Sequence, residues 1–264
     1  MTTTSVAARR SRGFSLVELM ISLLLGSLIT LAAVQLFGTN QRTFQLQQGL
    51  TDVQEQGRFA LDFLARDVRI MGLRNPQVTG GPAPGVVLAD LIAGPVVFPR
   101  SQDGGSNGAG NDRLTFSYQG RPGDMDCEGE AIVIDALIIN TYWVEDEELR
   151  CLGSVNPASG GLTLVAGVDS FQVQFGIDTA PDGVPSAGRY VRADMLGPTD
   201  QVVSVRIGLL VRATQGNLPP LGPPRDMLVL DRALTAGAAP LQESAIRRLF
   251  VTTVRARNYQ WGSI

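Results

Sequence analysis

The stretch RRSRGFSLVELMISLLLGSLITLAAVQLF, residues 9–37, decides the fold of this 264-residue chain. It opens with three arginines, passes the small residue Gly13, and continues from Phe14 as an apolar run. About 20 apolar residues suffice to cross the hydrocarbon of a bilayer, so the run predicts a membrane-spanning helix. Because basic residues favour the cytoplasmic side, residues 1–13 are expected in the cytoplasm and the rest of the chain outside it.

One charged residue, Glu18, interrupts the apolar run. A carboxylate early in a spanning helix costs about 2.5–3.5 kcal/mol on insertion scales unless a partner compensates it. The run holds no Lys or Arg, so either an amine from elsewhere pairs with Glu18 or its carboxylate reaches the headgroups. Ser22, Gly26 and Thr30 recur every four residues and would let another helix approach closely. Ordinary tolerance of small residues facing lipid is the alternative.

The string GFSLVEL, residues 13–19, resembles the prepilin cleavage and methylation signal of type IV pilins and type II secretion pseudopilins. A secretory signal peptide is cut after its apolar core, whereas this junction precedes the core, so the helix stays with the mature chain. The resemblance implies that a prepilin peptidase cuts after Gly13 and that the new amino group of Phe14 is N-methylated. It also implies that Glu18 helps to recruit the subunit into a helical filament, where the Phe14 amine of a neighbouring copy would pair with it.

The composition excludes several kinds of chemistry. The chain contains no His, so it cannot build a Ser-His-Asp triad, a His-ligated zinc site or a His general base. Its formal net charge is −3, and loss of the leader with its three arginines makes the mature chain more acidic still. An acidic chain is a poor general binder of nucleic acid. We therefore expect no enzymatic activity, no cofactor and no nucleic-acid partner.

Cys127 and Cys151 are the only two cysteines, too few for a structural zinc site. The expected orientation puts both outside the cytoplasm, where a disulfide persists. Closing such a loop would contribute roughly 3 kcal/mol in the chain-entropy model. We expect a disulfide, with two buried free thiols as the alternative.

Helical periodicity continues beyond the membrane run. Apolar residues recur at helical spacing over residues 46–68, and no Pro interrupts the chain before Pro76. We expect one helix to about Leu73, weakened and bent at Gly49 and Gly57 as well as at Gly38. The expected division is a cytoplasmic leader at 1–13, a transmembrane helix at 14–37, its soluble continuation at 38–75 and a β-rich domain at 76–264.

Short apolar runs separated by turn residues predict strands in the last part of the chain. These runs are residues 114–118, 131–144, 149–152, 162–165, 171–177, 190–193, 202–211, 227–230 and 248–256, with one more strand at 86–88 or 96–98. Alternation of apolar and polar residues is cleanest at 171–177 and 203–211, which predicts a half-buried antiparallel sheet. The expected fold class is α+β, with a long N-terminal helix packed on this sheet.

Several segments resemble the PilW class of type IV pilus minor pilins. They are GRFALDFLARDVRIMG (57–72), NDRLTFSY (111–118), VDSFQVQFGID (168–178), RYVRADMLG (189–197), VVSVRIGLLVRA (202–213) and RRLFVTTVRARN (247–258), together with the two cysteine positions. The resemblance implies a pilin-like fold and a non-enzymatic minor pilin, a structural or priming subunit of low abundance. The J-type minor pseudopilin of type II secretion shares this plan and is the nearest alternative. A membrane-anchored adhesin or receptor with a Gly-rich binding loop is a third hypothesis.

The resemblance also implies partners and location. The partners are other minor pilins and the major pilin, the prepilin peptidase, the inner-membrane pilus assembly machinery and the lipid bilayer. The protein would cross the inner membrane once, with its C-terminal domain in the periplasm, and later become part of the extracellular pilus.

Two loop patterns resemble sites of other chemistry. Residues 104–108 match G-x-S-x-G, but an esterase elbow needs a strand before it, a helix after it and a His. Residues 178–183 resemble the front of an EF-hand loop. Ala180 and Arg189 stand where that loop needs oxygen ligands, so we expect an ordinary turn.

The Gly-rich loop before the first long strand contains weak calcium candidates. Asp103, Asn111 and Asp112 carry the oxygen ligands that calcium prefers. The pattern occurs once, however, and a calcium-binding repeat of this kind needs neighbouring copies to stack on. We therefore expect a flexible loop and no bound metal.

Arginines gather near the C-terminus. Arg247, Arg255 and Arg257 would share one face of the last strand. Only Tyr259 and Trp261 are near enough to stack on bases, which favours a solvated or acid-paired face over nucleic-acid binding.

Overall fold

The computed structural model describes residues 13–107, 110–180, 182, 184–214, 222–242 and 244–257. The chain divides into two units, Met1–Gln47 and Gln48–Ile264. One helix, α1 (Leu16–Ile70), contributes residues to both. The three arginines of the leader, and Tyr259 and Trp261, lie outside the described residues.

The first part of α1 is an apolar helix whose side chains are exposed. It is long and apolar enough to cross a membrane, and none of its most apolar window is buried. Glu18 lies in its first turn, where the helix dipole favours a negative charge. The hydroxyls of Ser22 and Thr30 donate to the carbonyl oxygens of Glu18 and Gly26, at 2.7 and 2.8 Å. These hydroxyls are thus satisfied within the helix, as an apolar surrounding requires.

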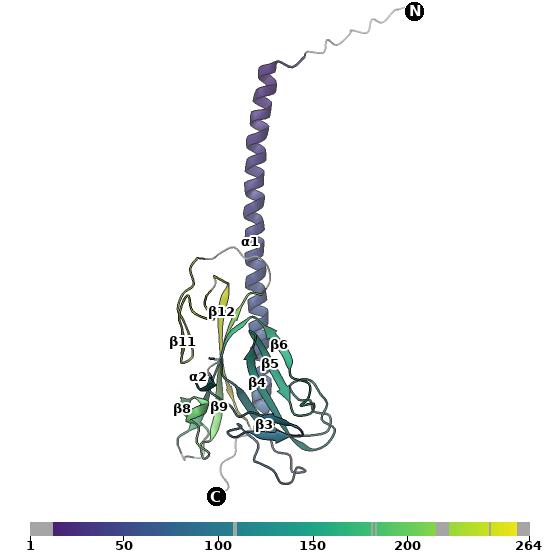
Figure 1. Ribbon diagram of the computed structural model, residues 1–264, viewed down its shortest axis with the longest axis vertical. Helices are drawn as coiled ribbons and strands as arrows, with labels where there is room; N and C mark the ends of the chain where they lie inside the picture. The colour runs from purple at the N-terminus through teal and green to yellow at the C-terminus, as the bar shows by residue number, and fades with distance from the viewer. Residues whose placement is uncertain are drawn as a thin grey trace, which may run out of the picture. The chain divides into compact units, whose positions relative to one another are not determined.

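The second unit is a β domain with two four-stranded antiparallel sheets (Figure 1). The first sheet has the order β3 (Leu114–Gly120), β4 (Ala136–Glu145), β5 (Glu148–Gly153), β6 (Leu162–Ala166). The second has the order β12 (Arg247–Arg255), β9 (Val202–Arg212), β7 (Val168–Asp178), β8 (Ala187–Val191). Two ribbons pair β1 (Leu91–Ala93) with β2 (Val96–Phe98) and β10 (Met227–Val229) with β11 (Arg232–Leu234). A short helix α2 (Gly104–Asn107) and a 3₁₀ turn η1 (Ala193–Met195) complete the described elements.

The last part of α1 contributes one face to the core of the β domain. Val53, Ala60, Leu64 and Val68 recur at intervals of four or seven residues along the helix and are buried. Gly57 belongs to the same face, and any Cβ there would overlap the ring of Phe250 on β12. Glycine at this position is therefore required by the close approach of a strand, rather than marking a bend.

The two central strands of the second sheet, β7 and β9, are buried on both faces, so the half-buried alternation expected for these two strands was wrong. All residues of β7 are buried except Gln174 and Asp178, which are partly exposed. A polar side chain that alternates with the apolar ones along β7 is covered too: Gln172 donates from Nε2 to the carbonyl oxygen of Gly110 at 2.8 Å. Next to them Leu210 packs in a small apolar cluster whose other buried members are Val229, Leu234 and Leu241. The loop before β3 and the β10–β11 ribbon thus form an extra layer on this sheet.

The expected fold class, a long N-terminal helix with antiparallel β-structure packed on it, is confirmed. Some boundaries differ from the sequence expectation. The helix ends at Ile70 rather than at Leu73, and the strand expected from residue 131 begins at Ala136. Ala193 lies in η1 and not in a strand. Of the two places suggested for an early strand, Val96–Phe98 forms β2, while Val86 makes only an isolated bridge to Phe116.

Candidate functional site

The first unit carries the residues expected to act in processing and assembly. Gly13 is the first described residue, and Phe14 after it is 83% exposed. Glu18 follows within the first turn of α1. None of the ion pairs among the described residues includes Glu18. The described part of this segment is thus an exposed apolar surface that carries one carboxylate.

In the β domain, Cys127 and Cys151 form a disulfide, with their Cα atoms 6.3 Å apart. It fastens the long loop between β3 and β4 to strand β5. Asp126 holds the same loop: its Oδ1 accepts the amides of Glu128 and Glu130, both at 3.0 Å. The two cysteines and Asp126 thus fix the position of an otherwise irregular segment.

A buried carboxyl group, Asp67, joins α1 to the first sheet. Its Oδ2 accepts hydrogen bonds from Nδ2 of Asn140 at 2.8 Å and from the hydroxyl of Tyr142. Burial is the largest cause that raises the pKa of Asp67, and it also raises the pKa of Tyr142 well above its ordinary value. Asp67 thus ties α1 to strand β4.

A second buried carboxyl group, Asp169, pairs with arginines of the second sheet. Its Oδ2 lies 2.5 Å from Nε of Arg247, and its Oδ1 lies 3.6 Å from Nε of Arg212. Burial raises the pKa of Asp169, although both arginines act in the opposite direction. Of the C-terminal arginines, Arg247 is thus acid-paired, whereas Arg255 donates to the carbonyl oxygen of Pro185 at 2.8 Å. Arg257 lies beyond β12 and is exposed.

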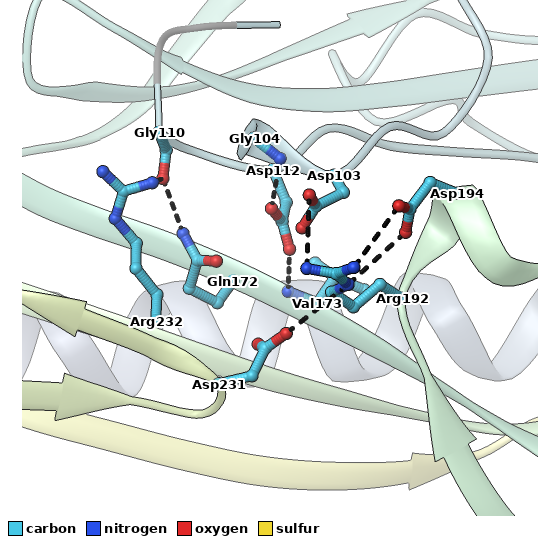
Figure 2. Close-up of polar contacts among 10 residues, drawn as sticks. All are labelled: Asp103, Gly104, Gly110, Asp112, Gln172, Val173, Arg192, Asp194, Asp231 and Arg232. Carbon is cyan, nitrogen blue, oxygen red and sulfur yellow. Dashed lines mark hydrogen bonds and ion pairs between the residues drawn. The ribbon is translucent and has the colours of Figure 1, made fainter. Parts of the chain in front are cut away.

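The third buried carboxyl group, Asp112, connects the Gly-rich loop to strand β7 (Figure 2). Its two oxygens accept the amides of Gly104 at 2.7 Å and of Val173 at 2.6 Å. The neighbouring Asn111 accepts the amide of Phe171 at 3.0 Å. Burial raises the pKa of Asp112 to about 7, and the charges of nearby carboxylates add to the effect. Both loop residues therefore serve as partners of the sheet's backbone.

Arg192 lies beside this loop among three carboxylates (Figure 2). Its guanidinium nitrogens are 3.9 Å from Asp103, 3.5 Å from Asp194 and 4.0 Å from Asp231. The calcium candidates are thus brought near one another, but Asp103 faces an arginine, while the oxygens of Asn111 and Asp112 are used by amides. Within the described ranges no group of three or more acidic or Cys side chains is arranged to hold a metal.

The two other loop patterns form ordinary local structure. The first four residues of the G-x-S-x-G match, Gly104–Asn107, form the short helix α2 where a loop was expected. Gly108 lies outside the described residues. In the EF-hand-like segment, Asp178 accepts the amide of Ala180 at 3.0 Å and Asp182 that of Val184 at 2.8 Å. Pro181 and Gly183 of this segment are outside the described residues.

Comparison with known proteins gives two family matches. Residues 139–258 match the family described as type IV pilus-assembly protein W, and residues 8–34 match the prokaryotic N-terminal methylation motif. None of the curated proteins matches the chain in sequence. Among solved structures, a type IV-like pilin from Thermus thermophilus is similar at 16% identity, with a TM-score of 0.44, over 80% of this chain and 98% of that one.

The methylation motif before an apolar helix, followed by antiparallel β-structure packed on the same helix, defines a type IV pilin. Within this class residues 139–258 match the PilW family of type IV pilus assembly proteins, and the role of the chain is that of a minor pilin. The expected resemblance is thereby confirmed.

Proposed function

We propose that this minor pilin is a structural, non-catalytic subunit that primes or caps a type IV pilus and enters the filament through residues 14–37. The observation that carries the proposal is the first part of α1, which is exposed, apolar and interrupted only by Glu18. An apolar helix with a single unpaired acid is poorly suited to lipid alone, because a buried carboxylate needs a counter-charge. A bundle of such helices supplies both apolar contact and a partner.

The proposed mechanism begins with cleavage after Gly13 by a prepilin peptidase. The cut creates an α-amino group at Phe14, which is then N-methylated. In the low dielectric of a helix bundle, the interaction of this amine with Glu18 of an adjacent subunit is stronger than it would be in water. The pairing would set the axial register of the subunit against its neighbours.

The proposed location follows from the same segment. Before assembly, residues 14–37 would cross the inner membrane once, with the β domain in the periplasm. The partners would be other minor pilins, the major pilin and the assembly machinery of the inner membrane. The match to a pilus-assembly family favours a pilus over the J-type pseudopilus of type II secretion. The Cys127–Cys151 disulfide supports a domain that resides outside the cytoplasm.

Substitution of Glu18 tests the proposal. We expect the Glu18→Gln variant to accumulate in the membrane and to be lost from sheared pili, as measured by immunoblot of both fractions. The matched control is Asp62→Asn, which removes an exposed carboxylate from the same helix. If the Glu18→Gln variant entered pili in wild-type amounts while adhesion was lost, the adhesin hypothesis would replace this one.

A further inference from the structure

The first sheet of the β domain has an open edge at strand β6. β6 is the last strand in its sheet, and across the described part of the chain no strand pairs with its outer side. Leu162, Thr163 and Ala166 of this strand are exposed. An edge strand presents unpaired N–H and C=O groups, which are a template for a further extended segment.

One flank of α1 runs beside this edge and is apolar. Phe59 is 51% exposed, and its ring centroid lies 6.0 Å from that of Phe63. A hollow of about 350 Å³ lies between helix and strand. Its lining consists of Glu55, Gln56, Phe59 and residues 164–166. A side chain pointing from an added strand toward the helix would therefore meet aromatic surface.

A second hollow of about 420 Å³ lies closer to the end of α1, where Phe63, Ile70 and Leu162 take part in its lining. We call the two hollows together the edge groove. The second hollow is acidic at its surface, since Asp124 and Glu128 line it against one arginine, Arg66. Asp67 and Asp126 also line it, but both are buried and their carboxyl oxygens accept hydrogen bonds from within the domain. A segment that carries a Lys or Arg at this end would complement the charge of the edge groove.

The dimensions and the exposed backbone indicate an extended occupant. The groove follows α1 from Glu55 to Ile70, roughly 22 Å at 1.5 Å per residue. That length corresponds to a strand of about seven residues at 3.3 Å per residue. A helix in the groove would leave the edge of β6 unpaired, because the backbone groups of a helix are bonded to each other.

We propose that the edge groove accepts an extended strand of a neighbouring pilin, which pairs with β6 as a fifth strand of the first sheet. Alternate apolar side chains of the strand pack on Phe59 and Phe63, and a basic residue at one end faces Asp124 and Glu128. That the strand comes from a pilin rests on the proposed function. The groove itself is a property of the β domain alone.

The test uses full-length protein in detergent micelles and a synthetic peptide of about seven residues. The peptide alternates Val and Thr, ends in Lys, is blocked at both ends and carries a fluorophore. We expect saturable binding by fluorescence anisotropy and slowed amide hydrogen exchange at residues 162–166. Phe59→Glu should weaken binding at least about tenfold, because it places a charge on the apolar wall. Leu228→Glu, at a side chain 60% exposed on β10, is the matched control and should leave binding unchanged.

Two further peptides distinguish strand pairing from simple apolar adhesion. A version with N-methyl groups on alternate amides keeps every side chain but cannot complete the ladder with β6, so it should not bind. A version with Glu in place of Lys should bind more weakly. Equal binding of the N-methylated peptide, an absence of saturable binding, or protection outside residues 162–166 would each overturn the proposal. None of these results depends on Glu18, so this inference and the proposed function fail separately.

Discussion

At the scale of single residues, three buried aspartates hold the β domain together. Asp67 bonds Asn140 across 73 positions of sequence, Asp112 bonds Val173 across 61, and Asp169 bonds Arg247 across 78. No local pattern connects such distant residues, so the sequence did not reveal these roles. It did single out Asp112, but only as a weak calcium candidate in a loop expected to bind no metal, because a loop carboxylate has the same local appearance whether it binds a cation or backbone amides.

The raised pKa of Asp112 predicts a pH dependence of stability. A carboxyl group whose folded pKa is about 7, against an ordinary value of 3.8, stabilises the fold fully below 3.8, and this contribution is lost as the pH rises through about 7. Between these values the free energy of unfolding should fall by about 1.4 kcal/mol per pH unit on account of this group. We expect Asp112→Asn to flatten the pH dependence of the urea midpoint between about pH 4 and pH 7, relative to the wild type.

The matched control for that experiment is Asp182→Asn. Asp182 also accepts a backbone amide, that of Val184 at 2.8 Å, but it is exposed. The Asp182→Asn variant should therefore show the same pH dependence of the urea midpoint as the wild type. A slope that stayed the same in the Asp112→Asn protein would show that this group does not titrate as described.

Tyr142→Phe tests the link between α1 and the first sheet. The change leaves Asp67 buried with one donor fewer and should lower the free energy of unfolding by about 1–3 kcal/mol. Tyr118→Phe removes a hydroxyl that donates to the neutral carbonyl of Met125 at 3.0 Å, so about 0.5–1.5 kcal/mol is expected there. Urea denaturation of both variants measures the two losses of unfolding free energy. A loss for Tyr142→Phe that is equal to or smaller than that for Tyr118→Phe would contradict the role of Asp67 as a link between α1 and the first sheet.

At the scale of elements, the sequence predicted the long strands and only some of the short ones. The strands β7 and β9 have 11 residues each, and their alternation predicted their positions. The alternation could not reveal that a second layer covers their polar face, since that layer comes from other parts of the chain. The strands β1 and β11 have three residues each, too few for any period to be seen.

Gly57 gives a prediction for the packing of α1. Leu at this position should improve helix propensity, but its side chain would overlap the ring of Phe250. We expect Gly57→Leu to lower the free energy of unfolding by about 1–3 kcal/mol through overpacking. Gly38→Leu is the matched control, because no atom lies within 4 Å of a Cβ built there. Thermal denaturation followed by circular dichroism should show a lower Tm for the first variant only.

The disulfide gives a second prediction at this scale. The cysteines are 24 positions apart, so their bond restricts the unfolded chain and should contribute about 2–4 kcal/mol. Reduction with dithiothreitol should lower the urea midpoint of the wild type to that of the Cys127→Ala/Cys151→Ala variant, which itself should not respond. A midpoint that dithiothreitol left unchanged in the wild type, with complete reduction shown by thiol titration, would argue against this contribution.

At the scale of the whole molecule, the sequence predicted the class of protein because the decisive signal is local and continuous. The basic cluster, Gly13, Phe14 and the apolar helix with Glu18 follow one another within residues 9–37. The edge groove, in contrast, is built from segments that are far apart in the sequence: α1, β6 and the loop after β3. Such a surface is visible only once the strand order is known.

The central claim is that processing at Gly13 creates the amine through which this minor pilin assembles. Mass spectrometry of the protein recovered from isolated pili tests it most directly, by reading the N-terminal peptide. The account predicts a chain that begins at N-methylated Phe14 and retains the whole apolar helix. A chain that still began at Met1, or that had lost the helix up to Phe37, would contradict it.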